Sequence, residues 1–255
     1  MADTDLPLKI KHVIRTAHGK LNRLNTARIP LCLPPQAKSP ALYALGLSRY
    51  AEIYLELEDM WHAQVGDADE WMGNTSYEPD AYGSDKERVQ AALRTIYLPE
   101  LLREKRLEAD LAAMKLLDPS IVNMLAAQGD ADSEFRQYLK QHVSKKPHLL
   151  VAYIWIMYQA LLNGGLFIRA ELMKAGPDFW GMSAEDMDPT ALPPPLSFWC
   201  VEEASFVKDQ FKECIISAEK LLTEAERREI LEESPGILRR CELITLQLDE
   251  ELSIR

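Results

Sequence analysis

Apolar side chains recur every three or four residues along most of this chain, which is the spacing of one face of an α-helix. The first segment shows the pattern clearly, with apolar residues at Leu6, Ile10, Val13, Ala17, Leu21 and Leu24. The alternation of apolar and polar residues that is typical of a half-buried strand is absent from the sequence. The pattern therefore predicts an all-α fold, with helices near 5–26, 40–64, 86–96, 98–116, 119–128, 131–144, 148–175, 197–221 and 223–252.

Helix-breaking residues separate these segments. The triple proline at 193–195 cannot continue a helix and predicts an extended connector. Residues 65–85 mix Gly, Asp, Asn, Ser and Pro without periodicity, which predicts a loop between two helices. Because no single helix carries enough apolar surface to be stable alone, we expect one domain over 1–255, a multi-helical bundle.

Charge and cysteine usage narrow the class of protein. The 255 residues include 40 acidic and 29 basic side chains, a formal charge of −11, which opposes attraction to phosphate backbones. We therefore expect no nucleic acid as a partner. The four cysteines are scattered without a C-x-x-C pair, which fits a reducing compartment. We see no apolar run near the roughly 18–20 residues of a membrane span, so we expect a soluble, cytoplasmic protein with no membrane span.

The helix predicted over 148–175 is the most informative segment. It is apolar on all sides for more than a turn, which indicates a buried central helix, and it contains Gly164 and Gly165 in its middle. Each glycine costs about 1 kcal/mol of helix stability relative to alanine, so the pair indicates that something needs the missing side chains. Close helix packing or a kink is one explanation. A flat ligand lying against the exposed backbone is the other.

A histidine and three lysines are the other candidates. His18 follows Lys11 by seven residues in the first predicted helix, so both project from nearly the same side, separated by roughly 10 Å of axial rise. A lone helical histidine is more often a packing or surface residue than a ligand. Lys208 and Lys212, four residues apart, would place two cations on one helix face, which is either a solvated face or an anion site.

A carboxylate-rich metal site is a further possibility. Glu58 and His62 are four residues apart, and a di-iron site could add carboxylates and a histidine from Glu52, Glu56, Asp59, Glu171 and His142. The paired Glu-x-x-His signature of such sites is absent. The sequence also lacks a phosphate-binding glycine loop and a G-x-S-x-G motif.

Four segments together resemble the heme oxygenase family, in the family's order. EIYLELE at 52–58 is similar to its second helix, and TIYLPELLREKRLEADL at 95–111 to its Tyr, Pro-Glu-Leu, Arg, Leu-Glu, Asp-Leu pattern. PHLLVAYIWIMYQALLNGG at 147–165 resembles the distal helix, and LTEAERREILEES at 222–234 resembles the start of the last helix.

The resemblance implies a heme-binding protein of the heme oxygenase-like fold. It implies that His18 is the proximal ligand of the heme iron and that Gly164 and Gly165 lie over the other face of the heme. It further implies that Lys11, Lys208 and Lys212 meet the propionates, with Asn22 as a polar neighbour of the histidine. The family's reaction opens heme to biliverdin, carbon monoxide and iron, with electrons from a separate reductase.

The distal motif departs from the family pattern. Where the family has Gly, Asp, two variable residues, Gly, Gly, this sequence has Ala160, Leu161, Leu162, Asn163, Gly164 and Gly165, so leucine replaces the catalytic aspartate. Trp155 and Met157 replace a tyrosine and an arginine that help to seat the heme. Leucine can neither order water nor deliver a proton, so we expect heme binding with poor heme opening. The alternatives are a heme-free helical interaction protein and a di-iron or small-molecule enzyme on the same fold.

Overall fold

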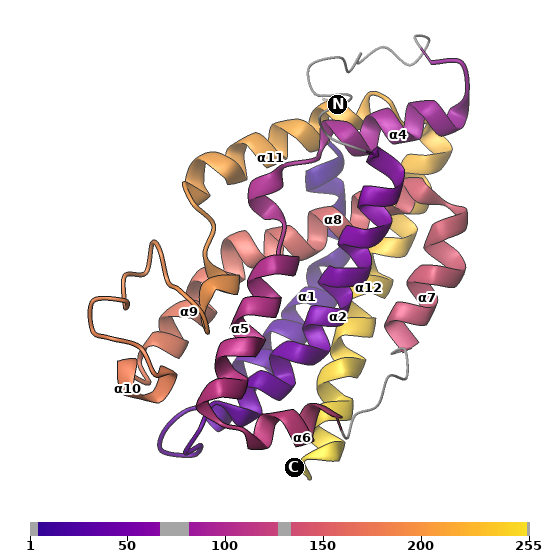
Figure 1. Ribbon diagram of the computed structural model, residues 1–255. Helices are drawn as coiled ribbons and strands as arrows, with labels where there is room; N and C mark the ends of the chain where they lie inside the picture. Colours follow the sequence, from indigo (N-terminus) through magenta and orange to yellow (C-terminus); the bar gives the residue numbers. More distant parts are fainter. Residues whose placement is uncertain (1–4, 67–81, 127–133, 254–255) are drawn as a thin grey trace.

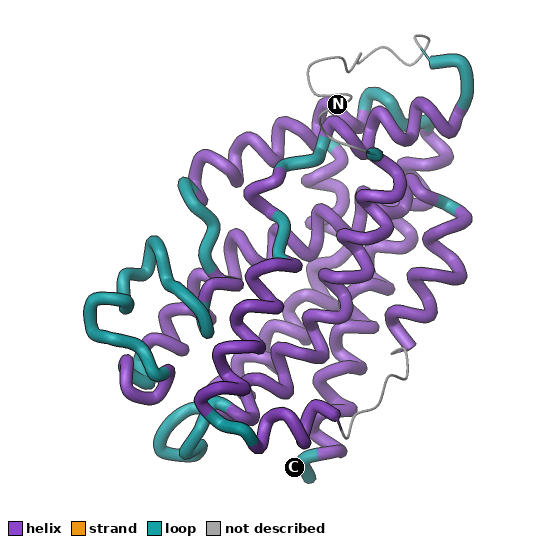
Figure 2. Tube along the Cα trace, in the orientation of Figure 1, coloured by secondary structure: helices purple, strands orange, loops and turns teal. Residues whose placement is uncertain are grey.

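The computed structural model describes residues 5–66, 82–126 and 134–253, and within these ranges it contains helices and connecting turns but no strand (Figures 1 and 2). The α-helices are α1 (Leu6–Arg28), α2 (Ala41–Val65), α4 (Asp85–Thr95), α5 (Glu104–Leu117), α6 (Ser120–Ala126), α7 (Glu134–His142), α8 (Leu150–Gln159), α9 (Gly165–Met173), α10 (Pro177–Trp180), α11 (Ala204–Glu219) and α12 (Glu224–Glu251). Short 3₁₀ turns are η1 (Ile29–Cys32), η3 (Pro99–Leu101), η4 (Val143–Lys145), η5 (Pro147–Leu149) and η7 (Ser197–Trp199), and η6 (Ala160–Gly164) is a π-helical turn. The prediction of an all-α fold is confirmed. Most of the predicted loop over 65–85 lies outside the described residues.

Helices α2 and α8 each contribute more buried apolar residues to the core than any other described helix. α8 is buried on all sides, with nine of its ten residues buried, and it packs against α2 and α12. α1 and α12 lie side by side along much of their length, and α11 runs along the upper edge of the molecule in the orientation of Figure 1. The buried apolar side chains form one connected core.

Local capping chemistry fixes several helix starts. The Asp5 side chain accepts a hydrogen bond from the Leu8 amide at the start of α1, and Ser84 does the same for Glu87 at the start of α4. Thr223 and Glu226 form a reciprocal capping box at the start of α12. Such caps satisfy amides that have no partner inside the helix, and each stabilises by about 1 kcal/mol.

The apolar face of α1 differs from the predicted one. Leu6 and Ile10 are buried, but Val13 is 39% exposed and Ile14 packs against the core in its place. The face continues through Ala17 and Leu21, which are partly buried. Only the first turns of α1 are therefore fully packed, and its later turns are more open than the sequence pattern indicates.

Two predicted helices are interrupted. The segment predicted over 98–116 consists of η3 and α5, which are separated at Leu102–Arg103. The helix predicted from residue 197 begins only at Ala204, because residues 197–199 form η7 and Cys200 is extended. Tertiary hydrogen bonds described below hold both irregular segments.

The continuous helical region Pro147–Met173 is long and apolar enough to cross a membrane, so the prediction that no apolar run approaches that length was wrong. In this structure 72% of its most apolar window is buried inside the protein. The same apolar composition is what a central core helix requires, and α8 has that position here.

Candidate functional site

The central helix changes its winding at the segment that carries the two glycines. α8 leads into the π-helical turn η6, which continues as α9. A π turn inserts one residue into the helix and is often found at functional sites. Ala160, Asn163 and Gly164 are exposed, although every residue from 150 to 158 is buried. The turn therefore presents backbone and small side chains to an open face of an otherwise buried helix.

The two glycines have different surroundings. A Cβ atom at Gly164 would meet nothing within 4 Å. A Cβ at Gly165 would lie 3.3 Å from the Trp199 ring and 3.7 Å from Leu161. The Trp199 indole donates a hydrogen bond of 2.7 Å from Nε1 to the Tyr43 hydroxyl. Gly165 thus allows close packing of Trp199, while Gly164 leaves its face open.

Three buried charged side chains, Glu58, Arg103 and Asp110, fix the segment that carries Trp199, and we call them the clamp. The Asp110 carboxylate accepts hydrogen bonds from the Ser197 amide, the Ser197 hydroxyl and the Phe198 amide, at 3.0, 2.6 and 2.8 Å. Burial raises the pKa of Asp110 to about 6, although these three donors favour the ionised form. The Arg103 guanidinium, which is 1% exposed, donates to the carbonyl oxygens of Phe198 and Cys200.

Glu58 connects this clamp to α2. Its carboxylate accepts from the amides of Arg103 and Glu104 and from the Tyr158 hydroxyl. Burial lowers the pKa of Arg103 to about 10, so the guanidinium remains charged at pH 7. The segments 52–58 and 95–111 therefore act together to hold η7, and with it Trp199, against Gly165.

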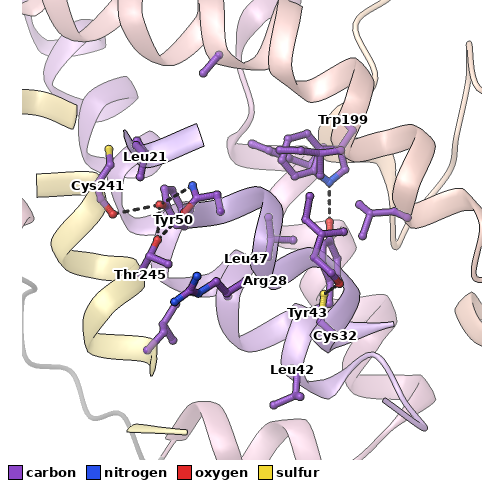
Figure 3. A pocket seen from close by; sticks show the side chains of 18 of the residues that line it. Leu21, Arg28, Cys32, Leu42, Tyr43, Leu47, Tyr50, Trp199, Cys241 and Thr245 are labelled. Carbon is purple, nitrogen blue, oxygen red and sulfur yellow. Dashed lines mark hydrogen bonds between the residues drawn. The ribbon is translucent and has the colours of Figure 1, made fainter. Parts of the chain in front are cut away.

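A cavity of about 270 Å³ lies beneath the π turn. Its walls come from α1, η1, α2, the α8–η6–α9 helix, η7 and α12. Leu21 and Asn25 of α1 and Ala160 and Leu161 of the turn all line it, so α1 and the π turn border the same space. In Figure 3, Tyr50 and Thr245 lie on one side of this space and Tyr43 with Trp199 on the other.

The polar groups around the cavity are bonded to one another. The Tyr50 hydroxyl is 3.0 Å from Asn25 Nδ2 and 2.9 Å from Thr245 Oγ1, and it donates to the Cys241 carbonyl. Arg28 donates from Nε and Nη2 to the two oxygens of Asp249. The interior surface is consequently apolar and rich in aromatic rings.

The two cysteines that line the cavity, Cys32 and Cys241, are poorly suited to ligate a metal ion at neutral pH. Burial raises the pKa of Cys32 to about 11 and that of Cys241 to about 12. Both therefore remain protonated thiols at neutral pH, whereas metal ligation requires the thiolate.

His18 and Lys11 are both exposed on α1. His18 lies four residues after Ile14 and three before Leu21, so its side chain borders the half-buried face of the helix. Asn25, which lines the cavity, follows His18 by seven residues and projects from nearly the same side. Asn22, the predicted polar neighbour of His18, is also exposed.

Lys208 and Lys212 project from the first half of α11, where Lys208 is half-buried and Lys212 is exposed. Within residues 5–66, 82–126 and 134–253, neither lysine forms an ion pair or a side-chain hydrogen bond, and the same is true of Lys11 and His18. None of the six predicted heme-binding residues (Lys11, His18, Gly164, Gly165, Lys208 and Lys212) lines the 270 Å³ cavity.

These residues fit a heme group on three points. The exposed imidazole of His18 has both nitrogens available as an axial ligand. Gly164 leaves an open surface on the π turn. The lysines of α11 are free to pair with carboxylates. The fit is incomplete at Leu161, which is buried and has no polar atom in its side chain.

The alternative di-iron site has no support in the part of the chain that the structure describes. No group of three or more His, Cys, Asp or Glu side chains there could hold a metal ion. Glu58 is already bonded to three donors, Glu56 pairs with Arg136, and the His62 ring is 3.1 Å from the Tyr97 hydroxyl.

Sequence reasoning missed the cavity and the clamp. One signal for the cavity is Gly46, a helix-destabilising residue in the second turn of helix α2. The clamp residues stand inside the segments quoted for the family resemblance, but the partners that they bring together lie 45 to 100 positions away in the sequence.

Comparisons with known proteins agree with this architecture. Residues 83–235, more than half of the chain, match the family model described as heme oxygenase. No curated protein matches the chain by sequence.

Solved structures share the fold at low sequence identity. A heme oxygenase from Leptospira interrogans is 16% identical with a TM-score of 0.64, and the match covers 95% of this chain and 98% of that one. Heme oxygenase-1 from the cyanobacterium Synechocystis, in complex with heme, is 13% identical with a TM-score of 0.66 and coverage of 98% and 94%. Heme oxygenase 2 from Chlamydomonas reinhardtii, without heme, is 16% identical with a TM-score of 0.66 and coverage of 95% and 96%. The chain belongs to the heme oxygenase family.

Proposed function

We propose that this protein binds heme between α1 and the π turn η6, where the His18 imidazole would hold the iron, and that it opens heme poorly. The observation that carries the proposal is the exposed face of the π turn. Ala160, Asn163 and Gly164 are open on a helix whose preceding turns are buried, and α1 borders the same space. A flat ligand would cover this face.

Each of the proposed residues would have a separate role in heme binding. The His18 imidazole would hold the iron, and Gly164 would let the backbone approach the porphyrin. Lys11, Lys208 and Lys212 would pair with the propionates, because buried or half-buried carboxylates need cationic partners. When bound, heme supplies a redox-active iron and is itself the molecule that the family's reaction opens, with electrons from a reductase.

The π turn itself, Ala160–Gly164, has no side chain with an ionisable proton. Leu161, which is 3% exposed, borders the apolar cavity and cannot order water or transfer a proton. Asn163 is the nearest polar group in the turn, but its amide nitrogen donates to the backbone and side-chain oxygens of Gln159. An amide has no ionisable proton at neutral pH, so it does not replace a carboxylic acid.

A heme titration followed by single-turnover assay tests the proposal. We expect a Soret band that saturates at one equivalent of heme, its loss in His18→Ala, and its retention in His12→Ala, a matched exposed histidine on another side of α1. With reductant and oxygen, the wild type should form little biliverdin, and Leu161→Asp should form more. No Soret band with wild type would support the heme-free alternative, and rapid biliverdin formation by wild type would contradict the distal part of the proposal.

A further inference from the structure

Helix α1 carries a charge opposite to that of the whole protein. It contains six of the 29 basic side chains and none of the 40 acidic ones, although the formal charge of the chain is −11. Leu8, Arg15 and Arg23 are exposed, and their spacings of seven and eight residues place them on nearly the same side of the helix. Within the described residues, neither arginine forms an ion pair or a side-chain hydrogen bond. The outer side of α1 is therefore a basic surface on an acidic protein.

Helix α12 extends this basic surface. α1 and α12 lie side by side, and Lys20 forms an ion pair with Glu242 across their contact. Arg239, Leu243 and Leu246 are exposed and are spaced by four and three residues, so they form one ridge on α12. Glu242 lies between Arg239 and Leu246 at spacings of three and four residues, so this ridge adjoins α1. We call the exposed side chains of both helices the outer α1–α12 face, which consists of Leu8, Arg15, Arg23, Arg239, Leu243 and Leu246.

The positive charge of this face is available to an anionic partner. In the part of the chain that the structure describes, Arg239 also forms no ion pair or side-chain hydrogen bond. Glu242, the one acidic residue inside the ridge, is already paired with Lys20. The exposed acids Glu232 and Glu250 of α12 lie beyond the two ends of the ridge. An anion that approaches the face therefore meets three guanidinium groups that can donate to it.

The leucines of the face indicate which kind of anionic surface fits it. Leu8, Leu243 and Leu246 are 48%, 49% and 38% exposed and stand among the arginines. Neither α1 nor α12 contains a Phe, Trp or Tyr side chain, and protein interfaces are commonly centred on such aromatic anchors. Separate leucines among arginines instead suit a bilayer. A leucine enters between the lipid head groups, while the long arginine stem keeps its guanidinium at the phosphates.

From these observations we propose that the outer α1–α12 face binds an anionic lipid surface, with its three arginines at the lipid phosphates and its three leucines among the upper parts of the acyl chains. Salt screens charges beyond roughly 8–10 Å at physiological ionic strength, so the arginines at the contact act more strongly than acidic groups on the far side of the molecule. The attachment is peripheral, and the apolar region Pro147–Met173 stays mostly buried inside the protein.

This inference goes beyond heme binding. His18 precedes Lys20 by two residues, which is a rotation of about 200° around the helix. Because Lys20 contacts α12, His18 projects toward the opposite side of α1. Heme held by His18 and lipid bound at the outer α1–α12 face would therefore use different sides of α1.

Co-sedimentation of the full chain with lipid vesicles tests the proposal. The probes are vesicles of phosphatidylcholine and phosphatidylserine in equal parts and vesicles of phosphatidylcholine alone. We expect saturable binding to the mixed vesicles at low ionic strength, at least about tenfold weaker binding to phosphatidylcholine, and progressive release as salt is added. Absence of binding to the mixed vesicles, or equal binding to both kinds of vesicle, would overturn the proposal.

The first variant removes the positive charges of the face by three changes made together, Arg15→Gln, Arg23→Gln and Arg239→Gln. It should lower the affinity for mixed vesicles about 100-fold, since each basic side chain near an anionic surface contributes about fivefold. The control variant Lys105→Gln, Lys115→Gln and Lys145→Gln removes the same charge from exposed positions elsewhere and should lower the affinity less than about threefold. Both variants should keep the urea midpoint of wild type, because exposed side chains are replaced. Equal loss of affinity in both would reduce the effect to net charge and overturn the assigned face.

The second variant, Leu243→Ser with Leu246→Ser, tests the contribution of the leucines. It should lower the affinity for mixed vesicles at least about fivefold, because less apolar surface leaves water. Leu116→Ser with Val122→Ser is the matched control, since these side chains are 85% and 49% exposed at the junction of α5 and α6, and it should leave binding unchanged. Unchanged affinity in the first pair would overturn the insertion of leucines into lipid and would favour an acidic protein surface as the occupant.

A comparison with heme binding keeps this test separate from that of the proposed function. His18→Ala should bind the mixed vesicles like wild type, and the variant without the three arginines should keep the heme titration of wild type. Loss of vesicle binding in His18→Ala would overturn the assignment of lipid to the other side of α1. Failure of heme to bind at all would contradict the proposed function but leave this inference standing if the mixed vesicles bind.

Discussion

Asp110 shows how one side chain can determine the geometry of a site that it does not touch. Its two oxygens receive three donors from Ser197 and Phe198, and the next residue is Trp199, which packs on Gly165. The ionised carboxylate has only acceptors, which is what three converging donors require. The resulting turn sets where the indole lies against the π turn.

Asp110→Asn should destabilise the protein by about 1–3 kcal/mol, because the amide nitrogen would face a buried N–H donor and leave it unpaired. Urea unfolding at pH 7 measures the change. Asp186→Asn is the matched control, since Asp186 accepts from the amide and hydroxyl of Ser183 in the same manner but on the surface. We expect less than about 0.5 kcal/mol for the control. Equal losses in both variants would mean that the buried clamp adds nothing beyond a local turn.

At the scale of single elements, α11 carries two of the three lysines that are proposed to pair with the heme propionates, Lys208 and Lys212. The third is Lys11 of α1. Lys208→Glu with Lys212→Glu should lower heme affinity by about tenfold or more, because two attractive charges become repulsive near the propionates. Lys105→Glu with Lys115→Glu, on exposed positions of α5, changes the net charge by the same amount. Lys146 is less suitable as a control because it pairs with Glu229. Equal loss of affinity in both double variants, measured by heme titration, would reduce the effect to general electrostatics.

Helices that follow local rules were predictable as elements, and those that depend on distant partners were not. The limits of α2 and α12 were predicted to within one or two residues, because Gly66 ends one helix and Thr223 caps the other. The start of α11 was placed seven residues too early. The segment 197–203 is compatible with a helix, but the Ser197 and Phe198 amides bond to Asp110 instead. A partner 87 positions away leaves no local signal.

The π turn was also predictable only in part, because it depends on distant partners. The glycine pair correctly drew attention to 160–165, and a kink was one of the two alternatives that the sequence left open. The different roles of the two glycines could not be predicted, because Trp199 reaches Gly165 only through the folded clamp. Likewise, the cavity exists only where α1, α2, η6 and α12 meet, and no single element contains its shape.

At the scale of the whole molecule, packing is uneven across the proposed heme cleft. α8, on the side of the π turn, has nine of ten residues buried, whereas α1 has only three of 23, Leu6, Pro7 and Ile10. α1 is fastened at its ends: the Leu6 amide donates to Glu219, and Arg28 pairs with Asp249. Its middle, which includes His18, is held by partly buried side chains and a surface ion pair between Lys20 and Glu242.

This difference in burial predicts which segment opens locally and how heme changes the amide hydrogen exchange of that segment. Segments with few buried contacts exchange their amide hydrogens through local opening, at lower free energy than global unfolding. In the heme-free protein, amides of residues 13–24 should therefore exchange at least about 100-fold faster than those of α8, a difference of about 2.8 kcal/mol in opening free energy. Heme should slow exchange over residues 13–24, since a ligand held by His18 stabilises only the closed arrangement. His18→Ala should lose this protection, while His12→Ala keeps it. Hydrogen exchange followed by mass spectrometry measures each step, and protection of α1 equal to that of α8 before heme is added would contradict an α1 that is fixed mainly at its two ends.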